Sequence, residues 1–181
     1  MSEKTVYIVL FRGVGGKTQL PVAPLRKALS QAGFENVATY INSGNAVVKS
    51  ALTREEVAAS IAEICARDFA FDKAVHVVTR AEWERLIAQN PFAQAVAVPK
   101  SLHAVVLEAQ PDPARVEALR AFAVEGEGIE VVRNVAYLHT PHGFGRSKLA
   151  EKFDKGIGVA NTARNWNTVL KLAELAQAAE V

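Results

Sequence analysis

The sequence predicts an α+β fold built from two tandem βαββαβ subdomains, with antiparallel sheets and an added C-terminal helix. Runs rich in β-branched residues alternate with segments of helical spacing, and turn residues separate two pairs of these runs. The order strand, helix, hairpin, helix, strand occurs twice, although no residue-level repeat accompanies it. The first subdomain is expected at residues 1–92 and the second at 101–181, joined by an Ala/Val/Pro connection at 93–100.

The first subdomain contains four expected strands and three helices, the last of which is short. Pro24 suits the first turn of the first helix, and Gly33 suits its left-handed end. The turn sequence Asn-Ser-Gly-Asn at 42–45 tolerates hairpin geometry. A Thr-Arg-Glu-Glu capping box at 53–56 opens the second helix. The expected strands are the apolar or β-branched runs 5–11, 37–41, 46–48 and 74–78.

Another capping box, at 79–82, opens the short helix that closes the first subdomain and that Asn90-Pro91 ends. The second subdomain follows the 93–100 connection. Asp112 caps a later helix with Pro113 at its first position, and Ser147 caps the next one. The last helix is expected from about Thr162. The expected strands of this half are 103–107, 129–132, 135–138 and a minimal strand at 157–159.

Composition narrows the function classes. Half of the 181 residues are hydrophobic, which is enough for a sizeable core, and the formal net charge is +2. That charge is too small for bulk attraction to nucleic acid or to an anionic membrane. The one cysteine, Cys65, excludes an intrachain disulfide and fits a reducing cytosol. The apolar run that ends at Arg12 is too short for a signal sequence or a membrane span, so we expect a soluble cytoplasmic protein.

Two polar, glycine-rich turns of the first subdomain are expected to share one edge. In a βαββαβ unit the first and third strands are antiparallel neighbours, so residues 12–17 should lie beside residues 43–45. Backbone N–H groups and polar side chains that converge there would suit an anion. For the glycines at 13–16 taken alone, an ordinary tight turn is the alternative. The candidate ligand-binding residues of this edge are Arg12, Lys17, Ser43 and Asn45.

The segment FRGVGGKTQLPV at 11–22 matches neither nucleotide-binding fingerprint. A P-loop would need glycine where Phe11 stands and a helix that starts at the lysine, whereas Pro21 and Pro24 place the helix later. The dinucleotide fingerprint lacks its third glycine. The sequence therefore indicates no cofactor.

Two later segments place cations at expected helix starts. Arg146-Ser147-Lys148 sets a serine between two cations, which can hold a phosphate, although a capped and solvated helix start is the simpler alternative. If Thr162 caps the last helix, Trp166 faces the core while Arg164, Thr168 and Lys171 line a polar face, which could equally be a solvated surface. The candidate ligand-binding residues of these segments are Arg146, Ser147, Lys148, Arg164, Asn167 and Lys171.

Other reactive side chains have structural explanations. His139 and His142 lack a nearby third ligand, so no metal site is expected. Cys65 lies on the apolar stripe of its helix, which indicates a core residue. No nucleophile-elbow pattern occurs, so the sequence identifies neither a catalytic residue nor a reaction.

Five stretches of the sequence form a recognisable set: FRGVGGK, LRKALSQAGF, ENVATYINSGNAVV, PHGFGRSKL and TARNWNTVLKLAELA. Together they resemble the bacterial family catalogued as domain of unknown function 1697, across nearly the whole chain. The resemblance implies a duplicated ferredoxin-like α+β fold and no established activity. The family usually has Ile-Asn between the Arg-Gly and the Val-Gly-Gly, but here Val14 follows Gly13 directly. The first loop is therefore shorter, and any ligand contact that the family makes through that asparagine is not expected here.

Three functions stay open at this point. The favoured one is binding, with or without turnover, of a small anionic or phosphorylated ligand in a cleft between the halves. A nucleic-acid-binding module is the alternative by fold analogy, but the expected strand residues 46–49 lack the aromatic side chains of an RNA-stacking sheet. A protein interaction or oligomerisation module is the third. The sequence names neither a partner nor an oligomeric state.

Overall fold

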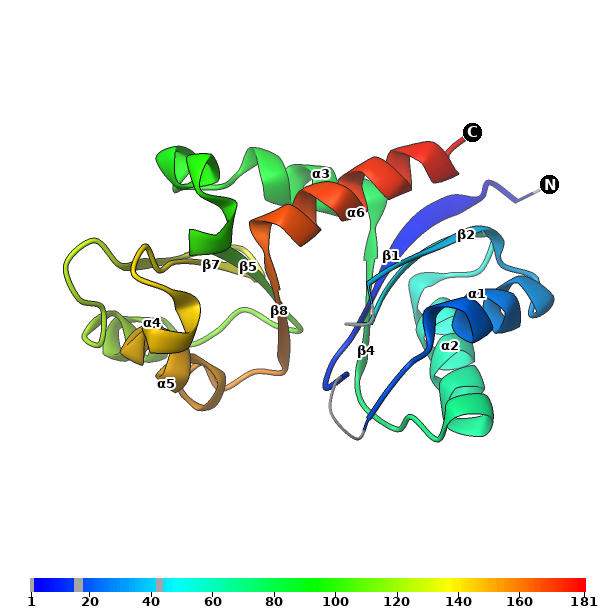
Figure 1. Ribbon diagram of the computed structural model, residues 1–181, viewed down its shortest axis with the longest axis horizontal. Helices are drawn as coiled ribbons and strands as arrows, with labels where there is room; N and C mark the ends of the chain where they lie inside the picture. Colours follow the sequence, from blue (N-terminus) through cyan, green and yellow to red (C-terminus); the bar gives the residue numbers. More distant parts are fainter. Residues whose placement is uncertain (1, 15–17, 42–43) are drawn as a thin grey trace. The chain divides into compact units, whose positions relative to one another are not determined.

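The computed structural model of the protein describes residues 2–14, 18–41 and 44–181, which form two compact units (Figure 1). The first unit runs to Arg85 and includes Lys171–Val181, and the second is Leu86–Leu170. Each unit contains one four-stranded antiparallel sheet. The fold is therefore mixed α+β, with six α-helices in the described part of the chain.

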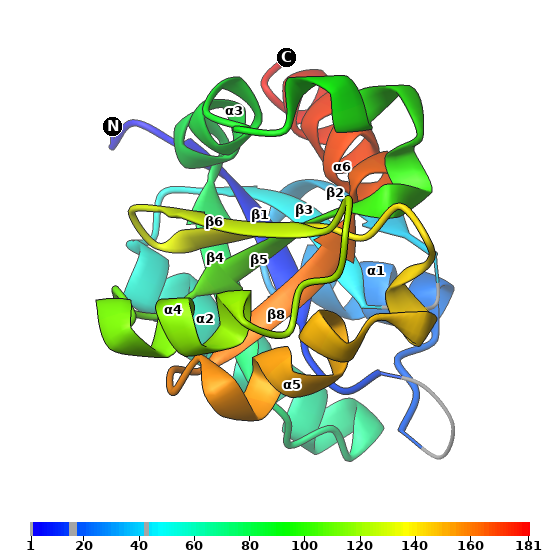
Figure 2. The same ribbon diagram turned by 90° about the vertical axis from the view of Figure 1, so that its left-hand side faces the viewer.

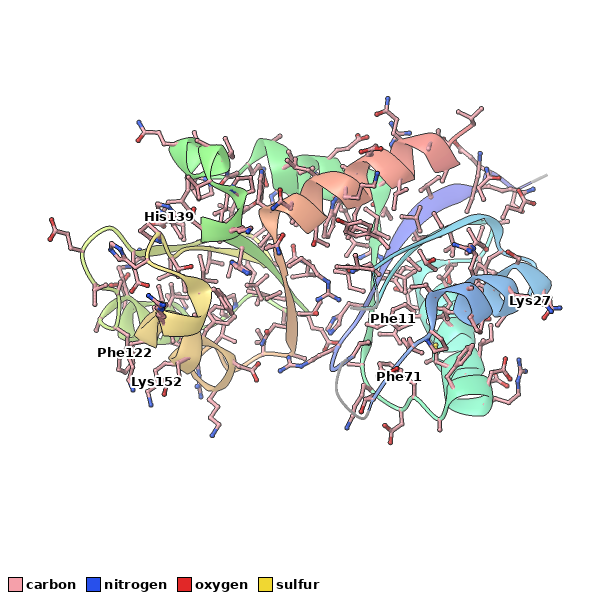
Figure 3. All side chains as sticks on the ribbon, viewed as in Figure 1. Phe11, Lys27, Phe71, Phe122, His139 and Lys152 are labelled. Atoms are coloured by element: carbon pink, nitrogen blue, oxygen red, sulfur yellow. The ribbon has the colours of Figure 1, made fainter. Side chains whose placement is uncertain are left out.

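The first unit has its strands in the order β2-β3-β1-β4, with both covering helices on one face of the sheet (Figure 1). Alternate residues of the central strand, such as Val9 and Phe11, face these helices and pack with Leu29 and Ile61. Phe11 also meets Phe71 edge to face, with ring centroids 5.9 Å apart (Figure 3). The elements are β1 (Thr5–Phe11), α1 (Val22–Gln31), β2 (Glu35–Tyr40), β3 (Asn45–Ser50), α2 (Arg54–Phe69) and β4 (Val75–Thr79).

The second unit repeats this order of elements, and its strands lie in the order β6-β7-β5-β8. Val105 and Leu107 of the central strand pack against Leu149 and Phe153 of α5, and α4 and α5 lie on the same side of the sheet (Figure 2). The elements are β5 (Leu102–Leu107), α4 (Pro113–Arg120), β6 (Gly128–Val132), β7 (Val135–His139), α5 (Lys148–Gly156) and β8 (Asn161–Asn165).

Further helices lie between these elements or follow the last strand. The helices α3 (Arg80–Ala88) and α6 (Trp166–Ala179) each include residues of both units. Three short 3-10 helices, η1 (Ala93–Ala97), η2 (Pro99–Ser101) and η3 (Phe144–Arg146), belong to the second unit. Within the described residues, no helix is long and apolar enough to span a membrane.

The helix-start signals at Thr53, Thr79 and Asp112 are confirmed. Thr53 and Glu56 exchange both capping-box hydrogen bonds, and Thr79 and Glu82 do the same. Asp112 caps α4 by accepting a hydrogen bond from the Ala114 N–H.

The expected order of elements near the C-terminus is correct, but the positions of the last strand and the last helix are wrong. The last strand is Asn161–Asn165 rather than 157–159, and α6 begins at Trp166 rather than near Thr162. Pairing with β5 draws this polar segment into the sheet, with Thr162 opposite Val106. The helix starts after Asn165 because its side-chain Oδ1 accepts a hydrogen bond from the Thr168 N–H at 3.1 Å.

The last residues of the chain are bound to the first unit. The Asn36 amide donates to the carbonyl oxygens of Ala179 and Val181, and Lys49 donates to that of Glu180. The Glu180 carboxylate lies 3.2 Å from the Arg80 guanidinium. The prediction placed this segment in the second subdomain because of its position in the chain. The predicted subdomain boundaries, 1–92 and 101–181, stay a prediction.

Candidate functional site

The two glycine-rich segments of the first unit adjoin as expected, as far as the structure describes them. The Phe11 N–H donates to the Gly44 carbonyl oxygen at 2.9 Å, and Leu10 lies opposite Asn45. Gly44 has a φ of 77°, and a Cβ there would lie 2.6 Å from Val14 Cγ2, so glycine is required. The predicted site residues Lys17 and Ser43 lie outside the described residues.

Of the other two predicted residues of this edge, Asn45 has a structural role. Asn45 is only 1% exposed, and its Nδ2 donates to the Tyr40 carbonyl oxygen at 3.2 Å, which closes the hairpin. Arg12 is half-buried, and its backbone N–H donates to the Ala74 carbonyl oxygen at 3.0 Å. The edge therefore exists, and Asn45 contributes to its stability.

The start of α5 has the features expected of an anion-binding helix terminus. Ser147 is buried, and its Oγ accepts a hydrogen bond from the Ala150 N–H at 3.1 Å. The first helical residues, Lys148 and Leu149, have no helical acceptor for their N–H groups. Lys148 is exposed and lies 3.3 Å from Glu151. Arg146 is exposed, and its guanidinium has no charged partner among the residues that the structure describes.

A row of polar side chains crosses the end of the second sheet beside this helix start. His103 of β5 lies opposite Asn165 of β8 and Leu138 of β7. The Thr140 N–H donates to the Ser101 carbonyl oxygen at 2.8 Å, which continues the pairing beyond β7. Alternation places His103 and Thr140 on the same sheet face as the core residue Leu138, because side chains on that face are two residues apart.

Two atoms in this row are buried without a hydrogen-bond partner in the described structure: Nδ1 of His103 and Oγ1 of Thr140. Thr140 is 0% exposed. Burial lowers the pKa of His103 to about 4, so its imidazole is neutral at pH 7. An unpaired buried polar group costs about 1–3 kcal/mol, so two neighbouring ones call for an explanation, such as a bound polar molecule.

The predicted polar face of the last helix does not exist. Arg164 belongs to β8, where its guanidinium donates to Thr162 Oγ1 at 2.7 Å and to the Ala163 carbonyl oxygen at 2.8 Å. Burial lowers the pKa of Arg164 to about 10. Thr168, expected on the same face, is 5% exposed. The predicted positions of Arg164 and Thr168 are wrong because α6 starts later than expected.

The remaining two candidates in this segment lie on α6 itself. Asn167 is exposed, whereas Lys171 is half-buried and its Nζ lies 3.0 Å from Glu174. Trp166 is 2% exposed, as expected for a core residue.

Two surface hollows lie away from the predicted residues. One, of about 330 Å³, lies between α4 and the β6–β7 hairpin, and its Arg120 is bound by Glu117 and Glu130. The other, of about 300 Å³, lies in the first unit, where Arg80 is bound by Glu84 and Glu180. Arg120 and Arg80 already have carboxylate partners, which makes these two cations less available to an anion. Among the described residues, no group of three side chains is placed to hold a metal ion.

Comparison with known proteins gives the family. The model of the family described as "Protein of unknown function (DUF1697)" matches residues 4–137. The chain belongs to this family. The fold of this DUF1697 protein is similar to that of the conserved bacterial protein SP0830 from Streptococcus pneumoniae, with a TM-score of 0.75 and 20% sequence identity. The similarity covers 96% of this chain and 99% of that one. No curated protein matches the chain.

Sequence reasoning missed His103 and Thr140 as candidate residues of this DUF1697 protein. The signal that could have revealed His103 is a polar residue on the core-facing side of a strand, in register with Val105 and Leu107. Thr140 gave no such signal because it follows the strand and lies between a histidine and a proline.

Proposed function

We propose that this DUF1697 protein binds a small anionic ligand, such as a phosphate monoester, at the start of α5. The observation that carries the proposal is the start of α5, where Ser147 caps the helix and the Arg146 guanidinium has no carboxylate partner in the described structure. Arg146 and Lys148 supply positive charge at the same place. The proposal concerns binding, because no nucleophile and base pair accompanies these residues in the described structure.

Electrostatics favours an anion at this position. The N-terminus of a helix carries partial positive charge, worth about 0.3–1 kcal/mol to a nearby anion at an exposed site. Arg146 adds a guanidinium that no carboxylate in the described structure neutralises, and a guanidinium can bind phosphate with two parallel hydrogen bonds. The Lys148 charge is partly offset by Glu151. Such exposed contacts predict weak binding of inorganic phosphate alone, with a Kd on the order of 1 mM.

The edge of the first unit is the second place where the same function is proposed. Arg12 contributes a cation, and Lys17 and Ser43 are retained from the sequence. Asn45 would contribute only if its amide released the Tyr40 carbonyl oxygen.

The fold proposal is finer than the α+β description. We propose that each unit is a ferredoxin-like βαββαβ subdomain and that the chain arose by duplication. The equivalent strand orders, β2-β3-β1-β4 and β6-β7-β5-β8, support this proposal.

Thermal unfolding with added inorganic phosphate tests the anion site. At a phosphate concentration about tenfold above a millimolar Kd, the wild-type protein should gain about 1.4 kcal/mol, which raises its Tm by roughly 3–5 °C. Arg146→Ala should lose most of this gain. Lys155→Ala, which removes the same charge from the other end of α5, is the matched control and should keep the gain. Equal responses of the two variants, or no response of the wild type, would contradict the proposal.

A further inference from the structure

We propose that the outer strand of the second sheet, β6, binds an extended peptide segment in which an acidic residue stands two positions before an aliphatic one. The surface, called the β6 edge below, comprises Val131, Arg133 and the α4 residues Pro113 and Val116 across from them. It uses none of the residues at the start of α5, so it does not depend on the proposed anion site.

The backbone of β6 presents open hydrogen-bonding groups. β6 is the outer strand in the order β6-β7-β5-β8. Val132 and Val135 flank a two-residue turn and pair with each other, so alternation directs the N–H and carbonyl of Val131 away from β7. The outward carbonyl oxygen of Ile129, which follows the same alternation, accepts a hydrogen bond from Arg120 at 2.6 Å. Within the described part of the chain, no group bonds to the outward N–H and carbonyl of Val131.

A hollow that a peptide can enter lies along this edge. Arg120 lines the hollow of about 330 Å³ and also binds the outward carbonyl of Ile129, so the hollow is on the open side of β6. Pro113 and Val116 of α4 form the wall across from Val131. A groove between a helix and an outer strand is suited to an extended peptide that adds to the sheet as a further strand. A peptide residue paired with Val131 would exchange two main-chain hydrogen bonds.

The packing of Val131 selects an aliphatic side chain at the paired position. Val131 packs against the core cluster that includes Val116, on the sheet face that α4 covers. In an antiparallel pair, opposite residues direct their side chains to the same face. The peptide side chain opposite Val131 therefore meets Val116, which is 8% exposed, and Pro113. A valine or isoleucine matches this apolar wall.

Arg133 selects an acidic side chain. It follows Val131 by two residues, is exposed, lines the hollow and has no ion-pair partner among the residues that the structure describes. Arg120, by contrast, is bound by Glu117 and Glu130. The unneutralised charge of the hollow is therefore positive and lies at its turn end. In an antiparallel peptide, the residue two positions before the aliphatic one lies nearest to Arg133.

A ¹H–¹⁵N titration with short capped peptides tests the proposal on the wild-type protein. The probe is Thr-Glu-Thr-Val-Thr, and saturable shifts are expected at the Val131 and Arg133 amides. Because Arg120 already occupies the Ile129 carbonyl, the pairing is short, and the expected Kd is on the order of 0.1–1 mM. Replacing the peptide's glutamate by lysine, or its valine by N-methylvaline, should weaken binding at least about fivefold.

One pair of variants tests the contribution of Arg133. Arg133 has a φ of 57°, so Arg133→Asn removes the charge with a residue that tolerates this conformation. The variant should bind the peptide at least about fivefold more weakly. Lys155→Asn, which removes a positive charge from the end of α5, is the matched control and should bind like the wild type.

Three results would overturn the proposal. The first is the absence of saturable shifts at Val131 with the glutamate peptide. The second is equal binding of the N-methylated peptide, which would exclude main-chain pairing, or of the lysine peptide, which would exclude recognition by Arg133. The third is a dimer of the free protein, seen by sedimentation, that dissociates in Arg133→Asn, because a second copy would then occupy the β6 edge. The peptide comparisons on the wild type hold even if a variant fails to fold.

Discussion

The imidazole of His103 stacks on the phenyl ring of Phe144, with ring centroids 4.0 Å apart and ring planes inclined by 26°. This contact joins the central strand of the second sheet to the short helix that precedes α5. The stack therefore fixes the position of Arg146 relative to the polar end of the sheet.

The stacked pair should contribute measurably to stability. In a double-mutant cycle of His103→Ala and Phe144→Ala, followed by urea denaturation, we expect a coupling energy of about 0.5–1.5 kcal/mol. Phe122→Ala, which alters a 40% exposed ring elsewhere in the same unit, should show additive effects with His103→Ala. A coupling energy near zero for the stacked pair would mean that the two rings are not packed together in solution.

The stability of the protein should fall as the pH drops from about 6.5 towards 4. The pKa of His103 is lowered by burial from 6.5 to about 4, so in this range the unfolded state binds more protons than the folded state. Stability therefore rises with pH across this window and is fully present above it. The expected loss on acidification is on the order of 1–3 kcal/mol.

Comparison with His103→Phe isolates this contribution. The pKa values of Glu56 and Glu82 are also lowered, Glu56 chiefly by hydrogen bonding to the Thr53 N–H, and their contributions are lost at lower pH in both proteins. Urea denaturation at several pH values should give a shallower slope between pH 6.5 and 4 for His103→Phe. Identical slopes would argue against a buried, neutral His103.

Replacing Trp166 should be among the most damaging changes in α6. Trp166→Ala removes a large side chain that is 2% exposed, so the free energy of unfolding should fall by about 3–5 kcal/mol. Asn167→Ala, at the exposed neighbouring position, should change it by about 0.5 kcal/mol or less. Chemical denaturation compares the two variants, and similar small losses would show that Trp166 is not a core residue.

Arg164 and Lys171 should differ in their effects on stability. Arg164→Ala removes charge-assisted hydrogen bonds to Thr162 and Ala163 within β8, so we expect a loss of about 1.5–3 kcal/mol. Lys171→Ala removes an ion pair with Glu174 on the helix surface, worth about 0.5 kcal/mol. If both variants unfold at the same urea concentration as the wild type, the structural role assigned to Arg164 is wrong.

Local rules predicted most of the elements because their signals lie within a few residues. The Thr53 and Thr79 capping boxes, the Asp112 cap and the Gly33 helix end each depend on neighbouring residues. The strand β8 was not predicted because its sequence, Asn-Thr-Ala-Arg-Asn, is polar. This segment forms a strand through its pairing with β5.

The candidate site was predicted in part. The Arg146-Ser147-Lys148 helix start could be found from the sequence because a serine cap is a local signal. His103 and Thr140 could not, because their closeness depends on strand register and their lack of partners depends on packing across three strands. The placement of Arg164 on a helix face failed because the helix starts later than its residue types indicate.

The most direct test of the anion site is a two-dimensional ¹H–¹⁵N spectrum of the protein, recorded while inorganic phosphate is added. We predict that the largest shifts occur at the backbone amides of Arg146, Lys148 and Leu149, and that they saturate with a Kd on the order of 1 mM. Absence of saturable shifts at these three amides, or larger shifts elsewhere in the chain, would contradict binding at the start of α5.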